Sequence, residues 1–255
     1  MEPMIKAVSV ENLSRSFEGI QALSNVSFTA NKGERLVIIG PNGAGKTTLF
    51  HLITGEIPPT DGRVFLFGQN ATYMPPYRRT QLGIARTFQI TNLFPNLTLQ
   101  ENILLAVLGV SRQKFMMHHP VSSCKEILAR IDRFLALWDL QPYKQSLVRD
   151  LSYGVQRQVE VIMALSGGAR IVLLDEPTSG LSAAETKTMT SIILGLDPEM
   201  TLIIIEHDMD VAFRLAHTMV VLHHGMVLAV GPPAEIRADL RIKEIYLGAE
   251  GQATC

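Results

Sequence analysis

The sequence predicts an α/β fold, in which buried strands alternate with helices and a helical segment interrupts the alternation. Two largely apolar runs, residues 35–39 and 171–176, have the length and composition of buried strands, and the second run ends in two acids. The first run enters a glycine-rich turn, and a helix is expected directly after that turn. Residues 90–166 instead show the spacing of amphipathic helices. We therefore expect a mixed sheet, an antiparallel β part and an inserted helical part.

The length of 255 residues suits one large or two small domains, and we expect a single domain over residues 1–255. Its core is expected to combine residues 1–89 with residues 167–255, including the antiparallel β part. Residues 90–166 are expected to form the helical part inserted between these two segments.

Composition and charge exclude several classes of protein. With 23 basic and 24 acidic residues the formal net charge is −1, whereas a sequence-independent nucleic-acid binder needs a basic surface. Apolar residues make up 47% of the chain, which excludes a disordered chain. No run approaches the roughly 18 apolar residues of a membrane span, and no secretory signal is visible. Cys124 and Cys255 fit neither a metal site nor a disulfide framework, so we expect a reduced, cytosolic protein.

Strands and one helix are expected in the N-terminal part. Residues 7–30 show alternating apolar positions, which predict short strands. After the strand at 35–39, residues 47–53 predict a helix that Gly55 closes. Residues 56–68 carry prolines and a glycine before the segment VFLFG, which predicts a turn and then a strand.

The middle of the chain predicts helices. Residues 96–109 are expected to be helical, with Thr98 and Glu101 spaced as a capping box. Residues 125–140 place apolar side chains on one helical face. The irregular residues 110–124 between them predict a loop.

The α/β pattern returns after residue 170. Ser182 and Glu185 are spaced as a second capping box and open a helix. Residues 201–205 predict another buried strand, and residues 220–230 predict a hairpin that turns at 224–225. A final helix is expected from Pro233 to about Gly248.

Residues 40–48, GPNGAGKTT, fit the pattern G-x-x-x-x-G-K-[ST] of a phosphate-binding turn, the P-loop. Polyphosphate oxygens need several backbone N–H groups at once, and glycines let the backbone approach them closely. The helix that follows presents the positive end of its dipole to the anion. In this pattern the lysine reaches the β- and γ-phosphates, and the hydroxyl after it binds Mg²⁺. The candidate nucleotide-binding residues here are Gly40, Pro41, Asn42, Gly43, Ala44, Gly45, Lys46, Thr47 and Thr48.

Two adjacent acids, Asp175 and Glu176, stand at the end of the second apolar run. A buried strand that ends on carboxylates needs a reason, because burying an unpaired charge is costly. Together with the turn at 40–48, the pattern predicts that Asp175 holds Mg²⁺ and that Glu176 polarises the water that attacks the γ-phosphate. Two solvated acids at the end of a strand are the alternative interpretation.

Residues 151–160, LSYGVQRQVE, distinguish among proteins that contain such a turn. They resemble the LSGGQ signature of the ATP-binding-cassette (ABC) family. The other motifs of that family occur along this chain in the same order as in the family. These motifs are Phe17, the turn GPNGAGKTT, Gln89 in RTFQ, the strand end IVLLDE, SGLS at 179–182 and His207 in IIEHD. The resemblance covers nearly the whole chain and implies a cassette that binds and hydrolyses ATP.

The resemblance also implies that two cassettes share each nucleotide. Ser152 and Gly154 are expected at a helix start, whose N–H groups and dipole suit a γ-phosphate bound by the other subunit. A simple N-cap at Ser152 is compatible with this role. Val155 replaces the glutamine that usually ends the signature. We expect its backbone N–H to keep the phosphate contact, and the effect on rate and dimer affinity is left open.

Three positions receive roles from the resemblance alone. Phe17 lies where the family has an aromatic ring that stacks on adenine, and a core phenylalanine is the alternative. Gln89 lies where the family has a glutamine that touches Mg²⁺ or the attacking water, and His207 resembles a histidine that contacts the γ-phosphate. The expected Mg²⁺ ligands are Thr47, Gln89 and Asp175, and the expected catalytic residues are Lys46, Gln89, Glu176 and His207.

Residues 82–107, LGIARTFQITNLFPNLTLQENILLAV, narrow the resemblance further. They are similar to the ATPases of importers for branched-chain and hydrophobic amino acids, a branch that also includes urea and short-amide importers. Amino-acid uptake is the preferred interpretation, and urea or short-amide uptake is the alternative. A soluble ABC ATPase that acts on ribosomes or DNA is less favoured, because those proteins normally carry fused cassettes, long insertions or a basic surface.

This branch implies several partners. The cassette is expected to dock on two transmembrane permease subunits at the cytoplasmic face of the inner membrane, as a peripheral protein. A second ABC ATPase subunit completes a hetero- or homodimer, a periplasmic solute-binding protein is an indirect partner, and no nucleic acid is expected. The docking surface is expected near residues 89–96, where Phe88, Leu93, Phe94 and Pro95 offer apolar contact or pack internally.

Overall fold

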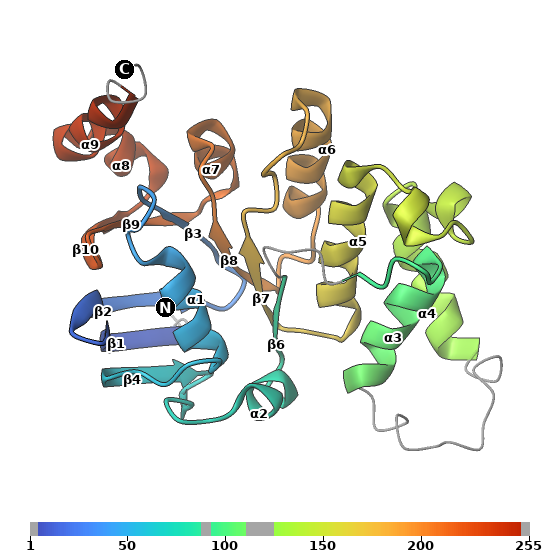
Figure 1. The fold of residues 1–255 in the computed structure, drawn as a ribbon, viewed down its shortest axis with the longest axis horizontal. Helices are drawn as coiled ribbons and strands as arrows, with labels where there is room; N and C mark the ends of the chain where they lie inside the picture. The colour runs from blue at the N-terminus through green and yellow to red at the C-terminus, as the bar shows by residue number, and fades with distance from the viewer. Residues whose placement is uncertain (1–4, 88–92, 111–124, 251–255) are drawn as a thin grey trace.

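The computed structural model describes residues 5–87, 93–110 and 125–250, which form two β-sheets with helices around and between them (Figure 1). The smaller sheet has the strand order β2-β1-β4-β5 and the larger sheet the order β10-β9-β3-β8-β7-β6. The strands are β1 (Lys6–Phe17), β2 (Ile20–Asn31), β3 (Arg35–Ile39), β4 (Asp61–Leu66), β5 (Gln69–Asn70), β6 (Ile84–Arg86), β7 (Ile171–Asp175), β8 (Thr201–Ile205), β9 (Thr218–His223) and β10 (Met226–Gly231). The helices are α1 (Lys46–Thr54), α2 (Pro76–Gln81), α3 (Leu99–Val110), α4 (Lys125–Leu137), α5 (Tyr153–Ser166), α6 (Ala183–Leu194), α7 (Met209–Leu215), α8 (Pro233–Ala238) and α9 (Leu240–Glu250), with short 3₁₀ turns η3 (Gln141–Tyr143) and η4 (Val148–Asp150).

The larger sheet is mixed and the smaller one antiparallel, which confirms the predicted fold class. Strands β9, β3, β8, β7 and β6 run parallel, and β10 pairs antiparallel with β9. Strand β3 sends Val37 and Ile39 into one hydrophobic cluster and Leu36 and Ile38 into another, because successive side chains of a strand point to opposite faces. A sheet covered on both faces needs strands that are apolar throughout, which explains the uninterrupted apolar runs of β3, β7 and β8.

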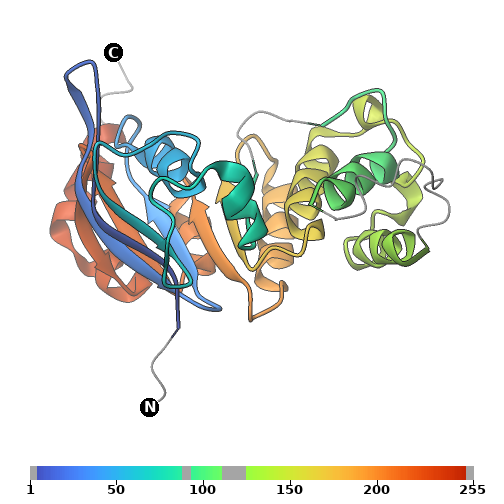
Figure 2. The same cartoon turned by 90° about the horizontal axis from the view of Figure 1, so that it is seen from below.

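Helices fill the space between the sheets and extend the molecule on one side. The Phe50 side chain of α1 belongs to the same buried cluster as Val8 of β1 and Ile38 of β3, so α1 is packed between the two sheets. Helices α3, α4 and α5 gather beyond β6, on the side away from the smaller sheet (Figures 1 and 2). Among the described residues, no helix is both long enough and apolar enough to cross a bilayer.

Local sequence signals locate several elements correctly. The three buried strands lie at the predicted residues, and the hairpin turns at His224 and Gly225 between β9 and β10. Ser182 forms a full capping box with Glu185 at the start of α6. Thr98 forms the same pair of bonds with Glu101 at the start of α3: the Thr98 N–H donates to Glu101 Oε2 (2.7 Å) and the Glu101 N–H to Thr98 Oγ1 (3.2 Å).

Three parts of the fold differ from the sequence prediction. Strands β1 and β2 have 12 residues each, whereas short strands are predicted. Helices α2 and α7, the two-residue strand β5 and the three-residue strand β6 are not predicted. The single predicted C-terminal helix is divided at Asp239, whose carboxylate accepts a hydrogen bond from the Arg241 backbone N–H (2.9 Å). That bond satisfies a backbone donor at the start of α9, so Asp239 separates two helices.

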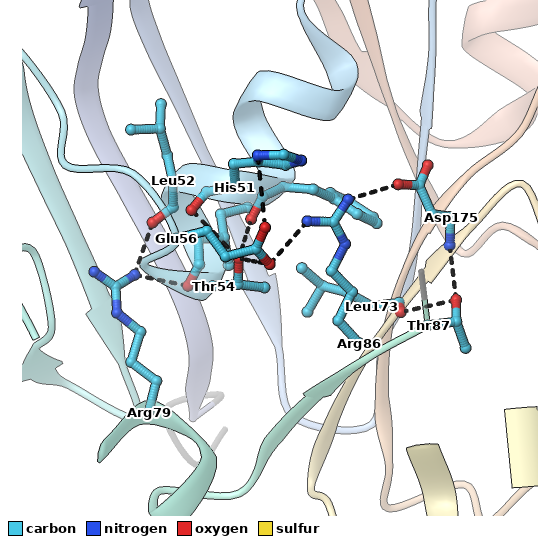
Figure 3. Close-up of polar contacts among 11 residues, drawn as sticks. His51, Leu52, Thr54, Glu56, Arg79, Arg86, Thr87, Leu173 and Asp175 are labelled. Carbon is cyan, nitrogen blue, oxygen red and sulfur yellow. Dashed lines mark hydrogen bonds and ion pairs between the residues drawn. The ribbon is translucent and has the colours of Figure 1, made fainter. Parts of the chain in front are cut away.

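A buried arginine fixes the C-terminal end of α1. The Arg79 side chain of α2 is 1% exposed, and its Nη1 donates to the carbonyl oxygens of Leu52 and Ile53 (2.7 Å each). These carbonyls belong to the last turn of α1, where no further turn of the helix can bond them (Figure 3). Burial lowers the pKa of Arg79 to about 10. Arg79 thus anchors the helix whose other end carries the glycine-rich turn.

Candidate functional site

The turn between β3 and α1 requires glycine at two of its positions. A Cβ atom on Gly40 would lie 2.3 Å from the carbonyl oxygen of Leu222, which no side chain tolerates. Gly45, the N-cap of α1, has φ of 100°, and a Cβ there would lie 2.6 Å from Leu23 Cδ2. The backbone therefore takes a path that only glycine allows, directly before the positive end of a helix.

Lys46 is the first residue of α1, and its side chain folds back over this turn. Its Nζ donates to the carbonyl oxygens of Gly40 (2.6 Å) and Pro41 (3.0 Å), and the residue is 6% exposed. Burial lowers the pKa of Lys46, while the negative charges of Glu176 and Asp175 oppose that shift. The predicted lysine and the two predicted acids therefore lie within electrostatic reach of one another.

The other residues of the turn differ in exposure. Asn42, Gly43 and Thr47 are exposed, Pro41, Gly45 and Thr48 are half-buried, and Gly40 and Ala44 are buried. Thr47 follows Lys46 at the start of α1 and is exposed to solvent. This is the arrangement that the pattern G-x-x-x-x-G-K-[ST] predicts for an anion held by the backbone and an oxygen ligand beside it.

Asp175 is 1% exposed at the end of β7, and it lies next to an arginine (Figure 3). Its Oδ2 accepts a hydrogen bond from Arg86 Nη2 (2.7 Å), and Arg86 Nη1 donates to Glu56 Oε1 (3.1 Å). The Asp175 backbone N–H donates to Thr87 Oγ1 (3.1 Å). Arg86 belongs to β6, which pairs with β7 in register. Sequence reasoning missed Arg86, because only the strand pairing brings it to Asp175. It also missed Glu56, which lies just after α1 and contacts Arg86 rather than Asp175.

The second carboxylate oxygen of Asp175 fits a metal ligand. Asp175 Oδ1 is buried and has no hydrogen-bond partner among the described residues. A buried carboxylate oxygen without a partner costs free energy, and a hard cation would satisfy it. Carboxylate and hydroxyl oxygens are ligands that Mg²⁺ accepts, so Asp175 and Thr47 have the donor atoms that this ion requires.

Glu176 and His207 lie just after two neighbouring strands, β7 and β8, and their side chains are in contact. Asp175 of β7 lies opposite Ile205 of β8, so the residues that follow begin at the same level of the sheet. The Glu176 N–H donates to the Ile205 carbonyl (3.0 Å), and Glu176 Oε1 contacts His207 Nε2. Glu176 has a φ of 49°, a costly conformation for a non-glycine residue that is concentrated at functional sites.

Ser152 and Gly154 lie at the start of α5, as predicted, and pack against the loop at 179–182. Ser152 Oγ accepts a hydrogen bond from the Val155 N–H (3.4 Å), so the N–H predicted for a phosphate contact is engaged in the helix cap. A Cβ on Gly154 would lie 2.2 Å from Glu185 Oε1. The Tyr153 hydroxyl donates to the Ser179 carbonyl (3.4 Å). The LSY segment and the SGLS segment therefore form one surface.

This surface is separate from the glycine-rich turn of the same chain. Helix α1 lies on the side of the smaller sheet, and α5 lies beyond β7 (Figures 1 and 2). Within this chain, Ser152 is therefore not placed with Lys46.

The remaining predicted residues give a mixed outcome. Phe17 is 40% exposed at the end of β1, which contradicts a core position, and the Arg15 guanidinium lies 4.5 Å from its ring centroid. Gln89 and Phe88 lie outside the described residues. Phe94 is 52% exposed, and the buried Asn102 side chain holds its backbone by accepting from the Phe94 N–H (2.8 Å) and donating to its carbonyl (3.1 Å).

Comparisons with known proteins agree with this geometry. The model of the ABC transporter family matches residues 23–179. The chain is 33% identical over 248 residues to the high-affinity branched-chain amino acid transport ATP-binding protein LivG of Escherichia coli (strain K12), covering 94% of this chain and 97% of that protein. The ADP conformation of MJ1267, an ATP-binding cassette of an ABC transporter, is similar with a TM-score of 0.83 and 27% identity, covering 96% of this chain and 99% of that chain. The dimeric post-hydrolysis state of the ATP-binding cassette MJ0796 bound to ADP and Pi is also similar, with a TM-score of 0.74 and 26% identity. The match covers 89% of this chain and 98% of that chain.

The family model spans most of the chain, and the similarity to LivG extends along nearly its whole length. The matched region includes the glycine-rich turn, the LSY segment and the acids at the end of β7. The chain therefore belongs to the ABC transporter family, as an ATP-binding subunit that hydrolyses ATP.

Proposed function

We propose that ATP binds over the glycine-rich turn and is hydrolysed beside Glu176. The observation that carries this proposal is the position of Lys46, which is held over the turn and lies within electrostatic reach of Asp175 and Glu176. With nucleotide present, its ammonium group exchanges the carbonyls of Gly40 and Pro41 for β- and γ-phosphate oxygens. Phe17, exposed at the end of β1, offers a ring for adenine to stack on.

We propose a separate role for each residue expected near the γ-phosphate. Thr47, Asp175 and Gln89 are the proposed ligands of Mg²⁺, which when bound neutralises charge that develops on the phosphates. The Glu176 carboxylate orients the attacking water and draws its proton away. His207 contacts Glu176 and is placed to contact the γ-phosphate as well.

We further propose that two cassettes share each nucleotide. Ser152 and Gly154 of a second cassette face the γ-phosphate bound by the first, because the helix start at α5 offers backbone N–H groups and a favourable dipole. The separation of α1 and α5 within one chain supports this arrangement (Figures 1 and 2), and so does the dimeric state of the similar cassette MJ0796. Residues 1–89 and 167–255 would form the nucleotide-binding core, and residues 90–166 the helical part that carries Ser152.

The solute is proposed from the similarity to LivG. We propose that this subunit energises the uptake of branched-chain amino acids, docked as a peripheral protein on two permease subunits at the cytoplasmic face of the inner membrane. The exposed Phe94, together with Leu93 and Pro95, would contact the permease, and a periplasmic solute-binding protein would deliver the amino acid. The second cassette is a copy of this chain or a different ABC ATPase subunit.

An uptake assay tests this function directly. A strain that lacks the gene for this chain is expected to lose ATP-dependent uptake of radiolabelled leucine and to regain it with the wild-type chain. The Lys46→Ala variant is expected to restore none, whereas Lys243→Ala, which removes an exposed lysine on α9, restores uptake fully. Unchanged leucine uptake in the deletion strain, with loss of urea uptake, would instead assign the subunit to a urea importer.

A further inference from the structure

A buried carboxylate that the proposed chemistry does not use directly precedes His207 in the chain. Glu206 directly follows β8 and is 2% exposed. Its Oε1 accepts hydrogen bonds from Thr178 Oγ1 (2.8 Å) and the Thr178 N–H (3.3 Å). Its Oε2 accepts one from the His207 N–H (3.1 Å). One side chain therefore binds the loop after β7 and the loop after β8.

This carboxylate is costly to bury. No ion pair found among the described residues includes Glu206, and burial raises its pKa to about 7. A buried charge without a counter-charge is poor evidence for stability, because an uncharged side chain of similar size avoids the desolvation cost. Stabilisation of the fold therefore does not explain why a glutamate is buried at position 206.

We propose that Glu206 is a positioning residue for hydrolysis, whose two carboxylate oxygens hold the loops of Glu176 and His207 at a fixed separation. The proposal rests on the hydrolytic roles proposed above for those two residues. Thr178 lies two residues after Glu176, and His207 directly follows Glu206, so each oxygen holds one loop. The contact of Glu176 Oε1 with His207 Nε2 depends on both loops being held.

The charge of Glu206 matters because every group that its oxygens contact is a donor. A protonated carboxyl, or a glutamine, places a donor opposite the Thr178 or His207 N–H and loses one of the two attachments. The titratable groups nearby are Asp175 at the end of β7, opposite Ile205, Glu176 after β7, and His207 and Asp208 after β8. Strand β3 faces Glu206 through the Ile38 carbonyl, which accepts from the Glu206 N–H (3.3 Å). Hydrolysis is therefore expected to fall as the pH drops through about 7.

Steady-state hydrolysis and ATP affinity of purified variants separate positioning from a merely structural role. Glu206→Gln is expected to lower kcat about tenfold, the effect of one hydrogen bond on a barrier, while the Kd for a fluorescent ATP analogue stays within about twofold. Thr178→Val removes only the hydroxyl donor and lowers kcat in the same direction, and Thr178→Ser restores it. Glu244→Gln, which removes an exposed carboxylate on α9, leaves kcat unchanged.

The pH profile gives a second readout. Wild-type kcat is expected to rise with pH on passing about 7, as Glu206 loses its proton, and Glu206→Gln is expected to lack that rise because it resembles the protonated form. Unchanged kcat and an unchanged profile in both Glu206→Gln and Thr178→Val would overturn the positioning role. Glu176→Gln, measured in parallel, separates the two proposals. If Glu176→Gln is inactive while Glu206→Gln is fully active, only the positioning role of Glu206 is overturned. If Glu176→Gln is fully active, the hydrolytic role of Glu176 is overturned, and with it the positioning role of Glu206.

Discussion

Replacing Lys46 by alanine is expected to lower ATP hydrolysis by about 100- to 1,000-fold, the usual effect of removing one donor that stabilises charge in a transition state. Lys46 is nearly buried over the glycine-rich turn, where its charge is screened less by water than at the surface. No shorter side chain at position 46 can reach an anion in this turn with a positive charge. Phosphate release at saturating ATP measures the effect.

The matched control for Lys46→Ala is Lys243→Ala, which removes a lysine from the exposed surface of α9. Because Lys46 also bonds the carbonyls of Gly40 and Pro41, the thermal unfolding of both variants shows whether the turn stays folded. A folded Lys46→Ala variant that hydrolyses ATP within about twofold of wild type would contradict the role of this lysine, since even one net hydrogen bond corresponds to several-fold.

Replacing Glu176 by glutamine is expected to stop hydrolysis and to preserve an ATP-bound dimer. Glutamine has nearly the shape of glutamate but cannot take a proton from water, and removing a general base typically lowers a rate by about 100- to 10,000-fold. The γ-phosphate then persists, and with it the contact that joins two cassettes. Sedimentation velocity with Mg²⁺ and ATP is expected to show a dimer of Glu176→Gln.

ADP provides the control for this dimer, because it lacks the γ-phosphate that Ser152 of a second cassette would contact. Glu176→Gln is therefore expected to sediment as a monomer with ADP. A monomer with ATP as well, in a variant that binds ATP and does not hydrolyse it, would show that copies of this chain do not share nucleotide.

Local motifs carried most of what the sequence could predict. The turn at 40–48 is recognisable because glycine is required at Gly40 and Gly45 by backbone geometry within a few residues of the lysine. The capping box of Ser182 and Glu185 is likewise contained in four residues. Such features depend on nearby atoms, so the sequence contains all that determines them.

The residues that prediction missed depend on contacts between distant segments. Arg86 reaches Asp175 only because β6 pairs with β7 in register, and a three-residue strand is too short to show a period of its own. Arg79 reaches the end of α1 from another helix. Glu206 did give a local signal, an acid directly after the apolar run TLIII, similar to Glu176 directly after β7. Its bonds to Thr178 follow only from the adjacency of β7 and β8.

Mixing two inactive variants tests most directly whether one ATP molecule contacts two cassettes. The Lys46→Ala variant lacks the lysine that binds phosphate at the glycine-rich turn, but its Ser152 is intact. The Ser152→Asp variant has an intact turn, but a negative charge at position 152 repels the γ-phosphate. A mixed pair contains one site with an intact turn from one chain and an intact Ser152 from the other. Shared sites therefore predict that the mixture regains ATP hydrolysis that neither variant shows alone. A mixture as inactive as its components would contradict a site shared between two copies of this chain, because a site made within one chain is broken in both variants.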